Sequence, residues 1–589
     1  MSKSNIHNMI ESAASIEPSQ SFQYGNGRFE IRQKGVFYVE SESERFICSP
    51  LDVSAQTLDA TGNAWGRLLQ WKDPAGNLHK WAMPIALLSG DSCAEFRAEL
   101  MSSGLDISPN KKERGLLAVY IQKIPTDKRA RCVERLGWYG GAYVLPTETI
   151  LPADSPDGGD NNETVVFQNL HMLEPAFSVS GTKEQWREYV ASLATGNSRL
   201  VFALSVSFAG TLLDIVGMEG GGFHFCGGSS KGKSTAQILA ASIWGNPAKY
   251  KRSWRTTANA LESIALLSND GLLILDEIRE ISPKEIGAAV YMLANGQAKS
   301  RANRSGFLAR RSQTWKTLFL SSGEIGLFEL LRQAGERANA GQEVRMAEIC
   351  IGDFENIHGY ETPGCFADAL RENSSRYYGA TGLEYLRRLV EKRSEQADAI
   401  RRCIDNFVSS VVPKGSAGQI SRVARRFGLA AVAGELATDY GLTGWPQGSA
   451  NEAARICLDS WIESFGGTSD REARQILSQV KAFFEAHGSS RFSDVSEINE
   501  TKITNRAGFY KAAGFGENLE KTYCVLPEVF KHEVCKGLNF RTAIKTLLKA
   551  GWLEAGSDKT PQKQRIPALG SKPTNVYVIN GKMWEAESC

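Results

Sequence analysis

The sequence lacks several features that would restrict its function at once. Its 11 cysteines include no C-x-x-C pair, and its 7 histidines do not cluster near them, so a zinc site or a redox dithiol is not indicated. It also has no large charge of one sign, because 68 basic residues stand against 66 acidic residues. The protein therefore has no overall positive charge that would attract nucleic acid, and any surface that binds nucleic acid must be a local patch.

The N-terminal residues show no basic start followed by a continuous apolar run, so they do not resemble a secretion signal. One stretch, residues 200–217, is long and apolar enough to resemble a membrane span. It contains Asp214, which would be costly in lipid, and it leads directly into a predicted strand. We therefore expect a buried core helix in a cytoplasmic protein that has no membrane partner.

A chain of 589 residues is too long for one hydrophobic core, so several domains are expected. After a flexible N-terminus at residues 1–21, short alternating segments separated by turn residues predict a β-rich α+β domain over residues 22–163. The stretch 151–164 is rich in Pro, Gly, Asp and Asn and marks its end. Alternating helix and strand patterns over residues 180–360 predict a parallel sheet covered by helices on both faces, with a helix at about 183–216.

The remainder of the chain is predicted to be helical and then mixed. Residues 361–489 show charged helical patterns, which are typical of solvated helix surfaces in a lid-like region. In residues 490–589, a helix at 539–550 precedes a basic loop at 559–572 and a closing strand, the order of a winged helix that often binds DNA. A loop that only aids solubility is the alternative. The predicted fold class is multidomain α/β, with a helical and winged-helix-like C-terminal region.

The most specific motif is G-x-x-x-x-G-K-S, which lies between a short apolar strand and a helix. Its glycines let backbone amides curl around phosphates, and the helix N-terminus adds its dipole. Lys233 is expected to neutralise phosphate charge, and Ser234 is expected to bind Mg²⁺. A glycine-rich turn that binds no nucleotide is the alternative. The residues expected to hold ATP are Gly227, Gly228, Ser229, Ser230, Lys231, Gly232, Lys233, Ser234 and Thr235.

Two carboxylates follow a second apolar strand in the segment GLLILDE, residues 271–277. If this strand is parallel to the strand before the P-loop, the carboxyl ends of both meet at one edge of the sheet. Asp276 would then hold Mg²⁺ through water, and Glu277 would polarise the water that attacks the γ-phosphate. The expected cofactors are therefore ATP and Mg²⁺.

A third strand, residues 317–322, ends in hydroxyl groups. Ser321 or Ser322 is placed to contact the γ-phosphate or the attacking water, and residues that merely cap the strand are the alternative. Beyond this strand, Arg337 and Arg345 are candidates for an arginine that reaches the γ-phosphate of a neighbouring subunit. Ordinary surface arginines are the alternative for both.

A locally basic segment, residues 298–311, lies between the acidic pair and the third strand. Its cations are suited to grip the phosphates of a threaded nucleic-acid strand, and its closeness to the ATP site would let it move with hydrolysis. A solvated loop or an inter-subunit surface is the alternative. The DNA-binding candidates are Lys299, Arg301, Arg304, Arg310 and Arg311.

Several stretches resemble the family called domain of unknown function 927, the ATPases of prophages, integrative elements and staphylococcal cassette chromosomes. The similar stretches are CSPLDVSAQTLDATGNAWGRLLQWKD, RLGWYGG, GGGFHFCGGSSKGKS, LLILDE, LFLSSGE and AGQEVR. The resemblance implies a minichromosome-maintenance-like AAA+ helicase. Such a protein forms a homo-hexamer with ATP sites between subunits and acts on single-stranded or forked DNA to replicate its mobile element. The sequence departs from that pattern at the sensor strand, which ends SSGE in place of Asn, and in lacking a Ser-Arg-Phe finger.

Two other functions fit the same motifs. One is an ATP-gated DNA-binding initiator or loader that assembles on DNA without processive unwinding. The other is a partner-activated defence ATPase in which the ring is a scaffold. Strand displacement separates the helicase from both alternatives.

Overall fold

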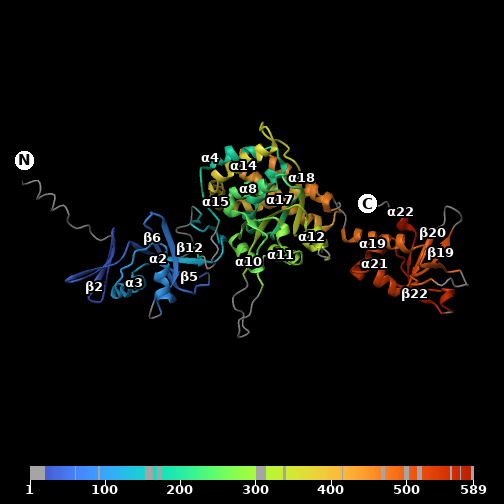
Figure 1. Ribbon diagram of the computed structural model, residues 1–589, viewed down its shortest axis with the longest axis horizontal. Coiled ribbons are helices and arrows are strands. Elements are labelled where there is room, and N and C mark those ends of the chain that lie inside the picture. Colours follow the sequence, from blue (N-terminus) through green and yellow to red (C-terminus); the bar gives the residue numbers. More distant parts are fainter. Residues whose placement is uncertain are drawn as a thin grey trace, which may run out of the picture. The chain divides into compact units, whose positions relative to one another are not determined.

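The computed structural model describes residues 20–59, 61–89, 93–152, 163–168, 176–299, 313–333, 335, 340–413, 415–465, 471–496, 503–513, 520–556, 560–570 and 572–585. Over these residues the protein is a multidomain α/β chain that contains five sheets (Figure 1). Its contacts divide it into two units. The first comprises Met1–Val411 and Val423–Trp461, and the second comprises Val412–Arg422 and Ile462–Cys589.

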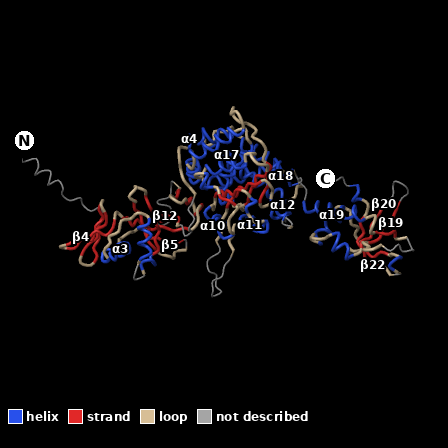
Figure 2. The backbone as a smooth tube through the Cα atoms, viewed as in Figure 1, coloured by secondary structure: helices blue, strands red, loops and turns tan. Residues whose placement is uncertain are grey.

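The N-terminal part of the first unit is built mainly from strands, drawn in red in Figure 2. An antiparallel sheet runs β1 (Gln20–Tyr24), β2 (Gly27–Arg32), β3 (Gly35–Glu40) and β4 (Ser43–Cys48). A mixed sheet has the order β12 (Glu163–Phe167), β8 (Arg129–Val133), β5 (Leu51–Asp59), β6 (Gly66–Lys72) and β7 (Leu78–Pro84). A small sheet holds β9 (Gly137–Tyr139), β10 (Ala142–Val144) and β11 (Thr149–Ile150), and the helical elements are a 3₁₀ turn (Ile85–Leu88), α2 (Ala94–Ser102) and α3 (Lys111–Lys123).

The centre of the first unit is a five-stranded sheet in which every neighbouring pair of strands is parallel, as the sequence predicts. Its order is β14 (Arg252–Ser253), β15 (Gly271–Asp276), β16 (Thr317–Gly323), β13 (Gly221–Cys226) and β17 (Met346–Cys350). The strand before the P-loop, β13, is thus separated from the acidic strand, β15, by β16. The carboxyl ends of all three strands therefore meet at one edge of the sheet.

Helices cover both faces of this sheet, as predicted (Figure 2). On one face, α10 (Ala258–Leu267), α11 (Pro283–Asn295) and α12 (Leu327–Gln333) share a buried apolar cluster with Leu273 and Phe319. On the other face, Phe223 of β13 packs edge-on against Phe202 of α6 (Ser198–Ala209) and Phe427 of α17 (Gly418–Asp439). The P-loop helix α8 (Lys233–Ser242) packs beside α6.

The helix predicted over residues 183–216 is interrupted in the structure. The segment consists of α4 (Lys183–Trp186), a π-helical turn (Arg187–Ala191), α5 (Ser192–Ala194), α6, a 3₁₀ turn (Gly210–Leu212) and α7 (Leu213–Val216). The helix ends before α6 at Gly196, whose φ of 79° is left-handed, and Asn197 then enters tertiary hydrogen bonds. Its Oδ1 accepts from the backbone N–H groups of Glu355 and Asn356, and its Nδ2 donates to the carbonyl of Asn356.

The apolar segment Ser198–Val216 is the one helix among the described residues that is long and apolar enough to cross a membrane. In this structure 89% of its apolar window is buried. Ser207 Oγ donates to the carbonyl of Ala240 in α8 at 2.7 Å, which fixes α6 against the P-loop helix. The segment is therefore a core helix of this unit, as the sequence predicts.

Helices dominate residues 363–487, as the charged periodic patterns predict. They are α14 (Pro363–Arg376), α15 (Ala380–Glu391), α16 (Arg393–Val411), α17, α18 (Ser449–Phe465) and α19 (Arg471–His487). Two short helices, α9 (Pro247–Tyr250) and α13 (Ala340–Glu343), lie earlier in the chain.

The second unit contains a five-stranded sheet with the order β18 (Phe492–Asp494), β19 (Gly508–Ala513), β20 (Glu520–Val525), β22 (Thr574–Ile579) and β21 (Gln562–Gln564). Besides α19, its helical elements are α20 (Pro527–Val529), a π-helical turn (Phe530–Val534), α21 (Phe540–Lys549), a 3₁₀ turn (Pro567–Leu569) and α22 (Lys582–Glu585). The predicted helix at 539–550 corresponds to α21, whose N-terminus is capped by the Asn539 side chain. The hairpin of β21 and β22 follows it, whereas the pairing of β18, β19 and β20 into the same sheet was not predicted.

A buried junction joins the small N-terminal sheet to the beginning of β15. Asp270, which directly precedes β15, accepts a hydrogen bond at Oδ2 from the backbone N–H of Trp138 (2.9 Å). The Tyr143 hydroxyl donates to the Asp270 carbonyl (2.7 Å), and the Trp138 indole N–H donates to the carbonyl of Thr211 (2.8 Å). Arg393 lies over the Trp138 ring at 4.1 Å. The N-terminal sheet is therefore fixed to the strand that carries the acidic pair.

Replacement of Asp270 by Asn is expected to stabilise the protein at neutral pH. Burial raises the pKa of the Asp270 carboxyl to about 6, and its Oδ1 has no hydrogen-bond partner among the described residues. Because this pKa lies above its unfolded value, the folded state binds more protons, and stability falls as pH rises from about 4 to about 6. Asn cannot ionise, and it tolerates the positive φ of 49° at this position.

The expected gain for Asp270→Asn is about 2–3 kcal/mol at pH 7.5, since about two pKa units separate the folded and unfolded states. At about pH 4.5, where the native carboxyl is protonated, the advantage should largely disappear. Thermal unfolding of both proteins at the two pH values measures this difference. An equal effect of the substitution at both pH values would contradict a buried, costly charge.

Candidate phosphate-binding site

The loop between β13 and α8 forms a concave backbone surface. Ser230 and Gly232 have φ values of 63° and 84°, so left-handed residues alternate with ordinary ones just before the helix begins at Lys233. Such a turn directs successive N–H groups toward one side and makes an anion-binding nest. No side chain caps the first turn of α8, so its N–H groups add to the same set of donors.

The three glycines of the loop have different surroundings. A side chain at Gly227 would lie 2.7 Å from the Ile351 carbonyl, and one at Gly232 would lie 3.0 Å from the Phe354 ring. A side chain at Gly228 would meet no atom within 4 Å. Gly227 and Gly232 therefore permit close packing of the loop, whereas Gly228 borders open space. The exposed backbone donors and this space fit a bound phosphate chain.

The two loop lysines have different roles in the structure. Lys233 Nζ donates to the carbonyl oxygens of Gly227 (2.7 Å) and Gly228 (2.6 Å), so its ammonium group lies within the loop. Lys231 Nζ instead pairs with Asp353 at 2.7 Å, and both of these side chains are exposed. The Thr235 side chain is buried and points into the protein. Of these three side chains, only that of Lys233 is directed at the loop interior.

The acidic pair lies at the carboxyl end of β15. Asp276 Oδ1 accepts from Ser322 Oγ at 2.6 Å, and the backbone N–H of Glu277 donates to the same hydroxyl at 3.4 Å. Glu277 has a φ of 52°, a left-handed conformation that is costly for a residue other than glycine. Such strain is concentrated at functional sites, and here it turns the chain immediately after Asp276. The structure thus brings Asp276, Glu277 and Ser322 together.

A buried glutamine ties α8 to the two strands that carry these groups. Gln237 Nε2 donates to the carbonyls of Leu275 (3.1 Å) and Leu320 (3.3 Å), and its Oε1 lies 3.3 Å from Ser322 Oγ. Because Ser234 precedes Gln237 by three residues, both side chains share one face of the helix. Ser234 is exposed in the first turn of α8, and the hard oxygens of Ser234 and Asp276 suit Mg²⁺.

The two candidate sensor serines occupy different environments. Ser321 is fully buried, and its Oγ contacts His224 Nδ1 and Trp254 Nε1, each at 2.9 Å. Burial lowers the pKa of His224 to about 4, so the ring is neutral at pH 7. Its Nε2 faces the carbonyl of Ile325 and must carry the proton, which leaves Nδ1 to accept from Ser321. Ser321 therefore belongs to an interior network, and Ser322 is the serine beside the acidic pair.

Of the two candidate arginines for a neighbouring subunit's ATP, the structure describes only Arg345. Arg345 lies over the Tyr291 ring at 4.0 Å and donates to Asn295 Oδ1 (3.1 Å) and the Gly341 carbonyl (2.8 Å). Its guanidinium is thus held within its own chain in this structure. Arg337 lies outside the described residues.

The predicted basic segment is described only at its beginning. Lys299 is exposed, and its backbone N–H donates to Glu262 Oε1 at 3.3 Å. This bond links the start of the segment to α10. The remaining four DNA-binding candidates lie outside the described residues, and they are Arg301, Arg304, Arg310 and Arg311.

Sequence reasoning did not identify several residues that organise this site. Gln237 is a lone polar residue in an otherwise apolar helix face, which is a signal that it has a buried partner. Lys251 contacts Asp276 Oδ2 at 2.5 Å, and Trp254 reaches Ser321, yet both belong to an unremarkable segment before α10. For these two residues, the sequence offers no local signal.

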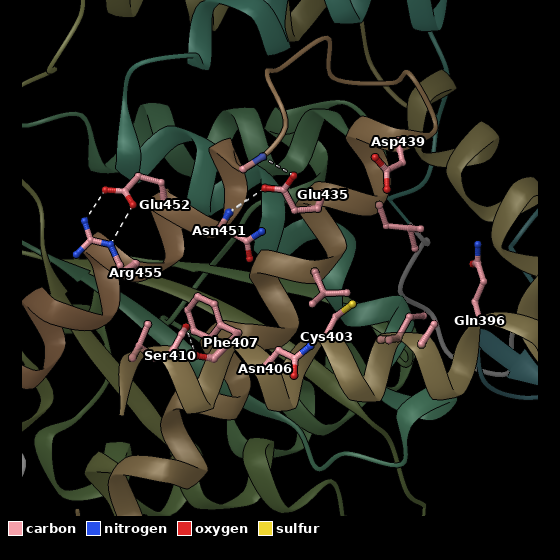
Figure 3. Close-up of a pocket in the computed structure, with 16 residues that line it drawn as sticks. Gln396, Cys403, Asn406, Phe407, Ser410, Glu435, Asp439, Asn451, Glu452 and Arg455 are labelled. Atoms are coloured by element: carbon pink, nitrogen blue, oxygen red, sulfur yellow. Dashed lines mark hydrogen bonds and ion pairs between the residues drawn. The ribbon is translucent and has the colours of Figure 1, made fainter. Parts of the chain in front are cut away.

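A cavity of about 680 Å³ lies among α16, α17 and α18, apart from the P-loop (Figure 3). Two of its acidic side chains are committed to local structure. Glu435 accepts from the backbone N–H groups of Gly448, Ala450 and Asn451 at the start of α18, and Glu452 pairs with Arg455. This cavity therefore offers no convergent set of reactive groups, and the P-loop edge is the candidate site.

Comparisons with known proteins agree with this architecture. Residues 29–314 match the family described as "Domain of unknown function (DUF927)". A solved structure described as "SCCmec type IV Cch - active helicase" is similar with a TM-score of 0.67 and 18% identity, covering 95% of this chain and 98% of that one. This likeness establishes a shared fold across nearly the whole chain.

A second solved structure, described as "The A form apo structure of NrS-1 C terminal region-CTR(305-718)", has 9% identity and a TM-score of only 0.28. It covers 87% of this chain and 96% of that one, but a TM-score this low carries no weight for the fold. Among curated proteins, none matches the chain.

Proposed function

We propose that this protein is an ATP-hydrolysing AAA+ motor that translocates on or unwinds DNA. One observation carries the proposal. The P-loop with Lys233 and Ser234, and the group of Asp276, Glu277 and Ser322, lie at the same carboxyl edge of one parallel sheet. The shared fold with a structure described as an active helicase supports the DNA-directed part of the proposal.

Each residue has a distinct task in hydrolysis. The loop amides and Lys233 hold the β- and γ-phosphates, and Ser234 and Asp276 hold Mg²⁺. The metal ion, when bound, offsets the charge of the phosphate oxygens. Glu277 accepts a proton from the attacking water, and in this structure its Oε1 accepts a hydrogen bond from the backbone N–H of Arg279 at 3.4 Å. Ser322 positions the acidic pair through its bonds to Asp276 Oδ1 and the Glu277 N–H.

The proposal extends to the organisation of the chain. We assign residues 22–163 to an N-terminal domain, 180–360 to the motor, 361–489 to a lid-like helical region and 490–589 to a winged-helix-like domain. A homo-hexamer would place Arg345 or Arg337 of one subunit near the ATP of the next. The basic segment that begins at Lys299 would contact the DNA strand, and the motor would serve replication of a mobile element or prophage.

ATP hydrolysis with and without single-stranded DNA, together with displacement of a labelled strand from forked DNA, tests this function. We expect DNA to accelerate hydrolysis and the protein to displace the strand only with ATP and Mg²⁺. Lys233→Ala serves as the inactive control and should abolish both activities. A rate of ATP hydrolysis that is the same with and without DNA would contradict a helicase and favour a partner-activated ATPase. DNA-stimulated hydrolysis without strand displacement would favour an initiator or loader.

A further inference from the structure

An unassigned lysine contacts the carboxylate proposed to hold the metal ion. Lys251 Nζ lies 2.5 Å from Asp276 Oδ2, and the side chains of both residues are about one-quarter exposed, at 24% and 27%. The Ser322 hydroxyl donates a hydrogen bond to the other oxygen, Oδ1, of the same carboxylate. Both oxygens of Asp276 are therefore engaged by groups of this chain.

The backbone around Lys251 is fixed to β15 on both sides. Before it, the Tyr250 hydroxyl donates to the Leu272 carbonyl at 2.8 Å. After it, β14 pairs with β15 so that Ser253 is opposite Asp276, and the Trp254 N–H donates to the Asp276 carbonyl at 3.1 Å. This anchoring holds the backbone of Lys251 beside the strand that carries Asp276.

A divalent cation at Asp276 would lie next to the Lys251 ammonium, where like charges repel strongly because the groups are partly buried. The metal and the ammonium therefore compete for one carboxylate. We propose that Lys251 is a built-in competitor of Mg²⁺ at Asp276, so that metal binding requires the lysine to be displaced. This inference rests on the proposed function, because it concerns the metal of the same site.

The competition links the metal ion to the nucleotide. An ammonium group displaced from Asp276 loses its ion-pair partner, and a nearby anion replaces that partner better than water does because Lys251 is only 24% exposed. The phosphates of a bound nucleotide bring such negative charge to this edge of the sheet. Displacement is therefore most favourable when metal and nucleotide bind together, which keeps Asp276 neutralised at other times.

Mg²⁺-dependent binding of a fluorescent ADP analogue tests the competition without any turnover. For Lys251→Met, we expect the Mg²⁺ concentration at half-maximal binding to fall by about two- to fivefold, the change that a partly exposed ion pair typically supplies. Lys251→Arg keeps the charge and should retain the wild-type Mg²⁺ dependence. Lys249→Met is the matched control, because Lys249 is an exposed lysine two residues away, and it should also match wild-type.

The outcomes separate this inference from the proposed function. If wild-type protein fails to bind the analogue at every Mg²⁺ concentration tested, both the proposed function and the competition are overturned. If wild-type binds but Lys251→Met has the same Mg²⁺ dependence or needs more Mg²⁺, only the competition is overturned. Weaker binding of Lys251→Met in the absence of Mg²⁺ would also overturn it, since Lys251 would then leave Asp276 for the nucleotide without any metal ion to displace it. Thermal unfolding verifies that each variant is folded.

Discussion

Glu277→Gln is expected to bind ATP normally and to hydrolyse it about 10²- to 10⁴-fold more slowly than wild-type, the usual contribution of a general base. The amide is almost the same size as the carboxylate, so the left-handed turn at residue 277 is retained. It cannot accept a proton from water at neutral pH. Binding depends on the loop and α8, which the substitution does not touch. Single-turnover hydrolysis and nucleotide titration measure the two quantities separately.

Glu280→Gln is a suitable control for this experiment. Glu280 lies three residues further on, is exposed, and accepts a hydrogen bond from Ser253 Oγ. Its loss should leave the rate of hydrolysis within a few-fold of wild-type. A Glu277→Gln protein that hydrolyses ATP at the wild-type rate would remove Glu277 from the reaction and would require another base.

Lys233→Ala is expected to weaken ATP binding by about 10- to 100-fold, because hydrogen bonds to charged groups are worth about 1.5–3 kcal/mol. Hydrolysis should be undetectable, since the γ-phosphate also loses the cation that offsets its charge in the transition state. The structure supports this role because the Lys233 ammonium already lies within the loop, on the carbonyls of Gly227 and Gly228. Nucleotide titration and steady-state hydrolysis test it.

Lys231→Ala is the matched control for the loop lysine. Lys231 belongs to the same motif, but its exposed ammonium pairs with Asp353 outside the loop. An exposed ion pair of this kind contributes at most about 1 kcal/mol, so the variant should bind and hydrolyse ATP much as wild-type does. Equal damage from the two substitutions would contradict the division of roles that the structure indicates.

The elements of the candidate site that could be predicted from sequence are those encoded by adjacent residues. The P-loop occupies eight consecutive positions, from Gly227 to Ser234, and the acidic pair directly follows four apolar residues of its strand. Their meeting at one edge followed from the expectation of parallel strands. Because the pattern alone fixes the local conformation here, the sequence was sufficient to place Lys233 and Asp276 on the correct elements.

The residues that could not be predicted act through contacts between distant parts of the chain. Lys251 is 25 positions from Asp276, and His224 is 97 positions from Ser321. Such pairs depend on strand register and on which helix covers which strand, and single-sequence patterns carry neither. The hydrogen bonds of Asn197 were missed for the same reason, since its partners lie near residue 356. The helix break before it did have a local signal, because Gly196 adopts a left-handed φ of 79°.

The junction at Asp270 also bears on how this protein can be divided into stable pieces. A fragment that begins after the Pro- and Gly-rich segment would lack Trp138 and Tyr143, which supply hydrogen bonds to the Asp270 carboxylate and carbonyl. Buried groups left without partners cost about 1–3 kcal/mol each. The cut would also remove the Leu136 carbonyl, which accepts a hydrogen bond from Asn269 Nδ2 at 2.7 Å. We therefore expect limited proteolysis to yield a durable motor fragment only when β9 and β10 stay attached to it.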